Sequence, residues 1–371
     1  MSVQKSCFPL SAIFFVIDWG FVLTCGEVPL ISVVVPCFNV ESSILRCLES
    51  LRAQSFRQNY EIVCVDDGSS DKTLPILRSI ALLDERVLVY SKDNDGAYST
   101  RLYGARKARG KYLAFVDGDD VVSPDYLQNM FDCAEMNLCD LVVCGFSRVL
   151  AGSGSVLSNE FCVPRIRTNV FDNPMDLVEI NPAPWNKLFR TSVFNSIEPI
   201  RPYPIMFDDL IMLLQYYGHF NGIVAYCPNP LIGYMIHEGS SINSVKPDQI
   251  DSAMSALETI RNSYDEAKNT RKLLPSLSVM AFVHLVVSMS FRLTSSGCSL
   301  NDYVKSSRGF LNRVFPGWNN NDCFSLTFAI KKRGIFLKAY ICFVLLKTGL
   351  FSGAIRLYAL MLKFIGKTVS W

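Results

Sequence analysis

The chain has 371 residues, half of them hydrophobic, and its 36 lysines and arginines almost balance its 34 acidic residues. A chain of this length accommodates roughly two or three domains, and the apolar content and small net charge exclude disorder. A net charge of +2 gives no basic field, so we expect no nucleic-acid partner. With only three histidines, a multi-histidine metal centre is almost excluded.

The thirteen cysteines include no Cys-x-x-Cys pair, and several, such as Cys37, Cys64 and Cys144, lie inside apolar runs. A thiol shielded from water packs as a small hydrophobic side chain. We therefore interpret the cysteines as core residues of a protein in a reducing compartment rather than as disulfides or zinc ligands.

Residues 1–28 form an apolar N-terminal extension, and residues 8–25 are almost continuously apolar. Asp18 lies within this run, where a carboxylate costs about 2.5–3.5 kcal/mol at the centre of a bilayer. The run also continues almost directly into the first predicted strand. We therefore expect a leader or a strand-like extension, with a signal peptide or a membrane anchor as the alternative.

Short apolar runs alternate with helical patterns from residue 30 to residue 144. Ser42 is the candidate N-cap of the first helix, Ser70 or Asp71 that of the second, and a third helix is predicted over 98–109. This alternation predicts an open, mostly parallel α/β sheet, which binds ligands at the carboxyl ends of its strands. The predicted strands are residues 30–36, 60–65, 86–90, 111–116 and 140–144.

Changes of pattern divide the rest of the chain into three parts. An α/β domain is expected over residues 29–245, a helical region over 246–329 and a basic tail over 330–371. Within the first part, residues 151–167 contain Gly-Ser-Gly and predict a loop or a hairpin insertion.

The tail carries eight basic residues and no acidic one, interspersed with large apolar side chains. Arg356, Lys363 and Lys367 share one helical face. No charge-free run in the tail reaches the ~20 residues that span a bilayer, so we expect a basic amphipathic helix pair on an anionic membrane surface. The alternative is a pair of helices packed on the protein with solvated lysines.

Three acidic clusters lie at the ends of predicted strands or before an apolar helix. Like charges at one sheet edge repel and are costly to desolvate, and a divalent cation removes this cost. Oxygen ligands without His or Cys favour Mg²⁺ or Mn²⁺ over zinc. Residues two apart in an extended turn point to one side, so Asp117 and Asp119 can address one ligand, although an Asx-turn gives the same pattern. The clusters are Asp66-Asp67, Asp117-x-Asp119-Asp120 and Asp208-Asp209.

Six segments in a fixed order closely resemble the inverting family-2 glycosyltransferases. The resemblance extends over residues 29–243, about two thirds of the chain. It implies a GT-A fold, a Rossmann-like and mostly parallel sheet, followed here by a helical C-terminal region. The segments are ISVVVPCFN at 31–39, IVCVDDGS at 62–69, KYLAFVDGDD at 111–120, WNKLF at 185–189, FDD at 207–209 and YMIHEGS at 234–240.

The resemblance implies a nucleotide-binding role for residues after the first two strands. Pro36, Phe38 and Asn39, with Glu41 nearby, and Asp67 would hold the nucleobase. From the residues alone, Pro36 can instead end a strand, and Asp67 can instead cap the following helix.

The resemblance also assigns the residues around the diphosphate. Arg101 is the candidate contact to base or phosphate, in a stretch where Leu102 replaces the asparagine usual in the family. Asp117 would face the ribose and base, and Asp119 would ligate the Mn²⁺ or Mg²⁺ that binds the diphosphate. Asp120 is a third carboxylate with a structural role.

An inverting transfer needs a carboxylate that accepts the proton of the attacking hydroxyl, while the metal neutralises the leaving group. Asp209 matches this base, and Asp208 replaces the usual glutamate on the acceptor side. Helix capping is the alternative role of Asp208. His237 is a candidate for binding the departing diphosphate. Trp185 is a candidate for stacking on an acceptor sugar, although its setting favours a core position.

The resemblance implies transfer of one sugar, with inversion, from a nucleotide-diphosphate donor, expected to be a UDP-sugar. The acceptor is a hydroxyl of a growing surface glycan or polyprenyl-linked oligosaccharide, as in capsule or exopolysaccharide synthesis. The expected location is the cytoplasmic face of the membrane. One alternative is a silent membrane-associated scaffold with this fold. Another is a nucleotidyltransferase, disfavoured because no glycine-rich loop follows the first strand.

Overall fold

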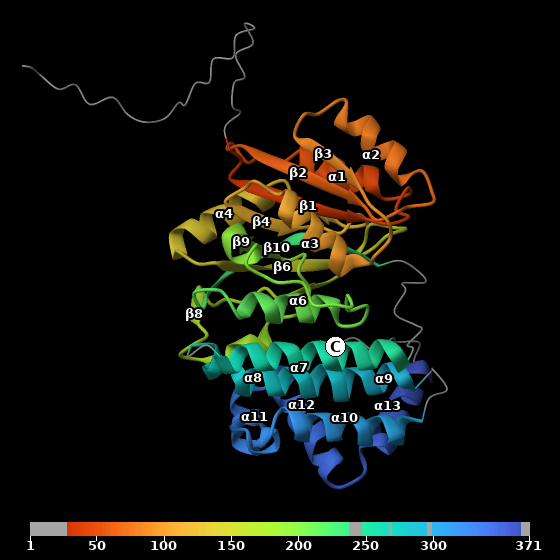
Figure 1. The fold of residues 1–371 in the computed structure, drawn as a ribbon, viewed down its shortest axis with the longest axis vertical. Coiled ribbons are helices and arrows are strands. Elements are labelled where there is room, and N and C mark those ends of the chain that lie inside the picture. The colour runs from red at the N-terminus through yellow and green to blue at the C-terminus, as the bar shows by residue number, and fades with distance from the viewer. Residues whose placement is uncertain (1–27, 237–246, 267–268, 295–298, 365–371) are drawn as a thin grey trace, which may run out of the picture.

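The computed structural model describes residues 28–236, 247–266, 269–294 and 299–364. The apolar run at 8–25 and His237 lie outside these residues. A sheet with helices on both faces forms one half of the molecule, and a stack of helices forms the other (Figure 1). Helix α6, Asp208–Tyr217, lies between the two halves.

Ten strands form one sheet in the order β3-β2-β1-β4-β9-β6-β10-β5, and β7 and β8 pair with β6 and β10. The first four strands of this order are parallel, which confirms the predicted fold class. The strands are β1 Ile31–Cys37, β2 Tyr60–Asp66, β3 Val87–Ser91, β4 Tyr112–Phe115, β5 Val121–Val122, β6 Leu141–Leu150, β7 Val156–Glu160, β8 Arg167–Asn169, β9 Lys187–Arg190 and β10 Ile223–Ile236.

The insertion of β9 was not predicted from the sequence. This strand is antiparallel to both β4 and β6 and lies between them. The fifth predicted strand, β6, therefore does not adjoin β4. The predicted hairpin at 151–167 is confirmed in its first part, because β7 turns back antiparallel onto β6.

The helices follow the predicted order, with corrections at the starts of α1 and α2. Its N-cap position is held by Ser43 rather than Ser42, and no side chain caps it. The prediction that Ser70 or Asp71 caps α2 is also wrong, because Lys72 holds its N-cap position and no side chain caps the helix. The Asp71 carboxylate accepts a hydrogen bond from the Thr73 amide (2.9 Å) just outside that position. The helices of the α/β half are α1 Ile44–Arg52, α2 Thr73–Ala81, α3 Ala97–Lys107, α4 Tyr126–Asn137, α5 Thr191–Phe194 and α6 Asp208–Tyr217, with a 3-10 helix at Pro174–Glu179.

The helical half begins at Pro247, close to the predicted boundary. Its segment Thr270–Leu293 is long and apolar enough to cross a membrane. The most apolar 18-residue stretch of the segment has a mean hydropathy of 1.8, but 83% of that stretch is buried inside the protein. The helices are α7 Pro247–Glu266, α8 Leu274–Ala281, α9 Met289–Leu293, α10 Leu300–Val314, α11 Leu326–Lys332, α12 Gly334–Lys347 and α13 Phe351–Phe364, with a π-helical segment Phe282–Ser288 and short 3-10 helices Thr270–Leu273, Trp318–Asn320 and Asp322–Phe324.

The core has two apolar clusters, one on each face of the sheet. Alternate residues of β1 contribute to them, because successive side chains of a strand point to opposite faces. Val33 belongs to the cluster under α1, α2 and α4. Val34 belongs to a cluster that continues through α3 and α6 into α7–α13. The helical half therefore shares its core with the sheet. Among the described cysteines nine are buried and only Cys162 is exposed, all as free thiols.

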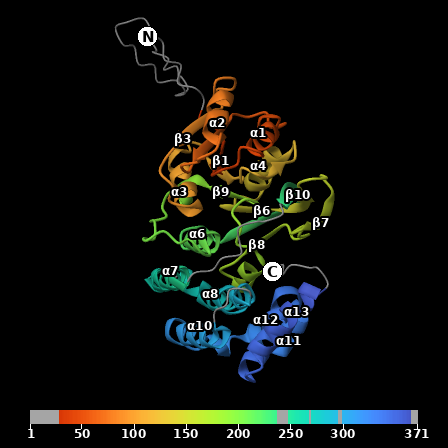
Figure 2. The same ribbon diagram turned by 90° about the vertical axis from the view of Figure 1, so that its right-hand side faces the viewer.

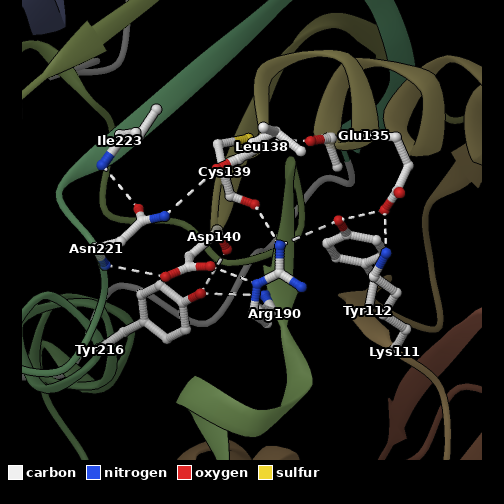
Figure 3. Close-up of polar contacts among 11 residues, drawn as sticks. Lys111, Tyr112, Glu135, Leu138, Cys139, Asp140, Arg190, Tyr216, Asn221 and Ile223 are labelled. Carbon is white, nitrogen blue, oxygen red and sulfur yellow. Dashed lines mark hydrogen bonds and ion pairs between the residues drawn. The ribbon is translucent and has the colours of Figure 1, made fainter.

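A polar network ties the sheet together at the end opposite the acidic loops. Arg190, at the end of β9, pairs with Asp140 before β6 and donates to the Tyr112 hydroxyl of β4 (3.3 Å). The Tyr216 hydroxyl of α6 donates to the Asp140 carbonyl. Figure 3 shows the Arg190 guanidinium between Asp140 and Tyr112. The network joins the end of β9 to β4 and to the start of β6, and it attaches α6 to the sheet through Tyr216.

Candidate active site

The loops after β1 and β2 are joined by side-chain hydrogen bonds. The Asn39 side-chain oxygen accepts from the Ser70 amide (2.9 Å), and the Glu41 carboxylate accepts from the Lys72 amide (2.8 Å). Asn39 itself has a φ of 52°, in the left-handed region that asparagine tolerates better than most residues. Phe38, between the strand and these contacts, keeps half of its surface exposed. Asn39 and Glu41 thus hold the loops, while the Phe38 ring is free for stacking.

Asp67 is buried beneath the loop that follows β3. One of its oxygens pairs with Lys92 and accepts from the Asp95 amide (3.1 Å), and the other accepts from the Gly96 amide (3.0 Å). Gly96 has a φ of 89°, a conformation that favours glycine. The carboxylate supports the loop leading into α3, and neither Asp66 nor Asp67 caps α2, whose N-cap position is Lys72.

The Asp-Gly-Asp-Asp turn follows β4 at the same edge. Asp117 and Asp119 are partly exposed, whereas Asp120 is 1% exposed. One Asp120 oxygen accepts from the Met235 amide of β10 (2.8 Å), and the other has no hydrogen-bond partner among the described residues. Burial, followed by the charge of Asp117, raises the pKa of Asp120 well above its ordinary value. Asp120 fixes the turn to β10 just before the segment that contains His237.

The turn offers a divalent cation oxygen donors only. In the part of the chain that the structure describes, no three His, Cys, Asp or Glu side chains gather into a metal cage. Mg²⁺ in particular is held by one or two carboxylates together with substrate phosphates rather than by a protein cage. The partly exposed Asp119, with Asp117 and the unpartnered oxygen of Asp120 beside it in sequence, fits that mode of binding.

The second acidic pair lies in the first turn of α6. Phe207 holds the N-cap position with a φ of 57°, and no side chain caps the helix. The alternative role of Asp208 as the cap of α6 is therefore wrong, because Asp208 is already its first helical residue. Carboxylates in a first turn are stabilised by the helix dipole.

Arg101 of α3 joins the two acidic groups. One guanidinium nitrogen lies 2.8 Å from Asp117, and the other lies 2.8 Å from Asp209 and 3.5 Å from Asp208. Arg101 is 5% exposed. Burial alone lowers its pKa, but the three carboxylates outweigh burial and raise it, so the guanidinium stays charged. The structure thus brings the predicted donor side and the predicted base together around one cation.

The two carboxylates of α6 have higher pKa values than exposed aspartates have. Burial is the main cause that raises the pKa of both carboxylates. The charge of Arg101 lowers each pKa, and the charges of neighbouring carboxylates raise it further. The pKa of Asp209 is raised to about 7. A group with this pKa exchanges protons near neutral pH, which suits a general base.

Lys187 and Trp185 belong to the segment that forms β9. Lys187 is fully buried, and its ammonium lies within 2.5–2.9 Å of four oxygens of Asn181, Ala183 and Asn186. Burial lowers the pKa of Lys187 to about 7. Trp185 is 8% exposed, with its ring stacked on Tyr234 at 5.3 Å. These positions support the core interpretation of Trp185, and contact with an acceptor stays a prediction.

Two cations near the site were not identified from the sequence. Nothing in the sequence marks Lys92 as a residue of the site, because a lysine in a polar loop is common. Arg292 ends the apolar run in the helix Thr270–Leu293, and its guanidinium carbon lies 6.0 Å from the centre of the Phe207 ring. The charge of Asp208 raises the pKa of Arg292 against the larger lowering by burial. The helical half therefore contributes a cation beside the acidic pair.

Several known proteins are similar to this chain. Residues 32–197 match the model of glycosyl transferase family 2. A Bacillus subtilis protein named as the glycosyltransferase EpsH is 29% identical over 291 residues, which are 76% of this chain and 79% of that protein. The poly(ribitol-phosphate) β-glucosyltransferase of Bacillus spizizenii is 34% identical over 116 residues, 30% of this chain and 18% of its own length.

The fold is also similar to solved structures. The crystal structure of S. aureus TarS 1–349 in complex with UDP-GlcNAc superposes with a TM-score of 0.64 and 17% identity, covering 92% of this chain and 93% of that one. The similarity extends through both halves, because coverage of this order includes most of the helical region. Residues 32–197 therefore belong to a region of the glycosyltransferase family 2 type, and the α/β half has the GT-A fold.

Proposed function

We propose that the protein transfers one sugar, with inversion at the anomeric carbon, from a nucleotide-diphosphate donor to a hydroxyl of a surface glycan or polyprenyl-linked oligosaccharide. The observation that carries this proposal is the bridge from Arg101 to Asp117 on the turn after β4 and to Asp209 on α6. A donor held at the turn then has its sugar close to a carboxylate with a raised pKa.

On the donor side, Asp117 faces the ribose and base, with Pro36, Phe38 and Asp67 beside the base. The half-exposed Phe38 ring supports stacking on a nucleobase. Asp119 holds Mn²⁺ or Mg²⁺, which neutralises charge on the leaving diphosphate when bound. The structure of TarS with UDP-GlcNAc supports a UDP-sugar as the donor, and His237 is a further candidate for the diphosphate.

On the acceptor side, Asp209 accepts the proton of the attacking hydroxyl, and Asp208 orients the acceptor. Arg101 stabilises Asp209 as the anion, since its charge lowers the pKa that burial raises. The name of the Bacillus spizizenii relative, a β-glucosyltransferase of poly(ribitol phosphate), supports a polymeric acceptor and a β-linked product.

The proposal is tested by incubating the purified chain with nucleotide sugars and lipid-linked glycan acceptors. Release of nucleoside diphosphate is measured, and the anomeric configuration of the product is determined by NMR. Inversion is expected. A product that retains the donor's configuration, or donor cleavage independent of any glycan, would contradict the assignment.

The Asp209→Asn variant should reduce transfer by at least about 100-fold, the lower range for loss of a general base. Donor affinity should stay unchanged, because Asp209 takes no part in donor binding. Asp132→Asn, on the exposed surface of α4, is the matched control and should transfer normally. Normal turnover by Asp209→Asn would remove this residue from the role of base.

A further inference from the structure

The last two helices pack with one face and leave the other exposed. Phe336 and Phe343 of α12 and Phe351 and Ile355 of α13 are buried in the core that reaches the sheet. Both helices belong to the end of the molecule farthest from α1 and α2 (Figure 2). The side chains that remain outside are large and apolar: Ile341 50%, Val344 38%, Leu350 63%, Leu357 70%, Tyr358 43%, Leu360 65%, Met361 51% and Phe364 92% exposed.

The outward face of α13 is apolar where a water-facing helix is polar. Leu357, Leu360, Met361 and Phe364 follow spacings of three, one and three residues, which places them on one side of the helix. A contiguous exposed apolar surface of this kind marks an interaction site. The alternative prediction from the sequence is that these helices pack on the protein. This packing explains the buried inner face of α13 but not its exposed apolar outer face.

Exposed basic side chains lie on the same helices and on the neighbouring α11. Lys331, Arg333, Lys347 and Arg356 are exposed, and no acidic residue follows Asp322 in the chain. The positive charge is therefore not neutralised by neighbouring carboxylates on these helices. Lys332 differs from the others, because it pairs with Asp176 (3.1 Å) and Glu179 (3.6 Å) and fixes α11 to the α/β half.

The structure assigns the outward face of α12 and α13 as a docking surface for an anionic membrane. The apolar side chains enter the boundary between headgroups and acyl chains, and the flanking cations contact lipid phosphates. A second copy of the chain fits less well, because a symmetric contact brings the same cations face to face. The membrane-length helix Thr270–Leu293 is not the contact, because it is buried. The inference is independent of the transferase activity.

The test is flotation of the full chain with two kinds of vesicle, phosphatidylcholine alone and phosphatidylcholine with phosphatidylglycerol. The chain should bind the anionic vesicles and release them in high salt. Each basic residue near an anionic leaflet changes partitioning roughly fivefold. Reversing two charges in Lys347→Glu with Arg356→Glu should therefore weaken binding at least about tenfold, and so should Leu357→Ser with Leu360→Ser.

Matched controls use exposed residues at the other end of the molecule. Leu82→Ser with Leu83→Ser, and Arg57→Glu with Arg78→Glu, should bind vesicles as the wild type does; thermal unfolding checks that every variant is folded. Failure of the wild type to bind anionic vesicles would overturn the inference, as would undiminished binding by the α12–α13 variants. A lipid-free dimer that becomes a monomer in Leu357→Ser with Leu360→Ser would assign the face to a second copy instead.

Discussion

At the scale of single residues, the site depends on Arg101. One buried guanidinium contacts a carboxylate of the turn after β4, 16 residues away in sequence, and one of helix α6, 108 residues away. Three carboxylates at one place would repel each other without it. The sequence motifs identified each carboxylate separately, but no local pattern predicts which residues meet across such separations. The hydrogen bonds of Asn39, Glu41 and Asp67 within the protein were unpredictable for the same reason.

The raised pKa of Asp209 predicts a pH dependence of transfer. The base must be ionised to accept a proton, so kcat/KM should be low in acid and rise with pH through about 7. Burial is the main cause, and the charge of Asp208 adds to it while Arg101 opposes it. Asp208→Asn removes a neighbouring negative charge and should move the acid limb to lower pH.

The measurement is kcat/KM from pH 5 to 9 for the wild type and for Asp208→Asn, with Asp132→Asn as the control. An acid limb near the ordinary range of aspartate in the wild type would contradict the raised pKa. A limb that moves to higher pH in Asp208→Asn would show that Asp208 acts on Asp209 other than by its charge.

At the scale of elements, apolar runs predicted the parallel strands and their helices because burial on both faces leaves a strong local signal. The antiparallel β9 was missed, since its four residues carry a pattern interpreted as chemistry rather than as a strand. Ser43, rather than Ser42, holds the N-cap position of α1. Its hydroxyl donates to the Gly118 carbonyl (3.2 Å) of the acidic turn, a contact from outside the helix that no local pattern shows.

The network around Arg190 should stabilise the fold without affecting the site. Asp140→Asn weakens a mostly buried ion pair and a hydrogen bond from the Asn221 amide (2.9 Å), at a cost of about 2 kcal/mol in unfolding free energy. Nucleotide affinity should stay unchanged, because the network lies at the opposite end of the strands. Urea unfolding and nucleotide titration measure the two effects.

The control is Lys111→Met in the same network (Figure 3). The Lys111–Glu135 pair has both side chains more than a third exposed, and such pairs contribute less than about 1 kcal/mol. Equal unfolding midpoints for Asp140→Asn and the wild type would show that the network contributes little. A large loss of nucleotide affinity would show that it acts on the site.

At the scale of the whole molecule, α6 couples the two halves. Its first turn carries the acidic pair, its buried side chains join the core that continues through the helical half, and Arg292 of that half lies against Phe207. The sequence predicted a helical region and an amphipathic tail from their composition. It did not predict that the helical half reaches the acidic pair, because a single cation at the end of an apolar run does not indicate what it contacts.

The central claim is that the turn after β4 holds a nucleotide diphosphate through a metal. Calorimetric titration of the full chain with UDP, GDP, CDP and ADP, with Mn²⁺ and then with EDTA, tests it most directly. We expect one nucleotide, UDP, to bind tightly with the metal and weakly without it. Asp119→Ala should abolish the metal-dependent part, whereas Asp209→Asn should bind as the wild type does. Failure of every nucleotide to bind, or equal affinity of Asp119→Ala with Mn²⁺ present, would contradict the account.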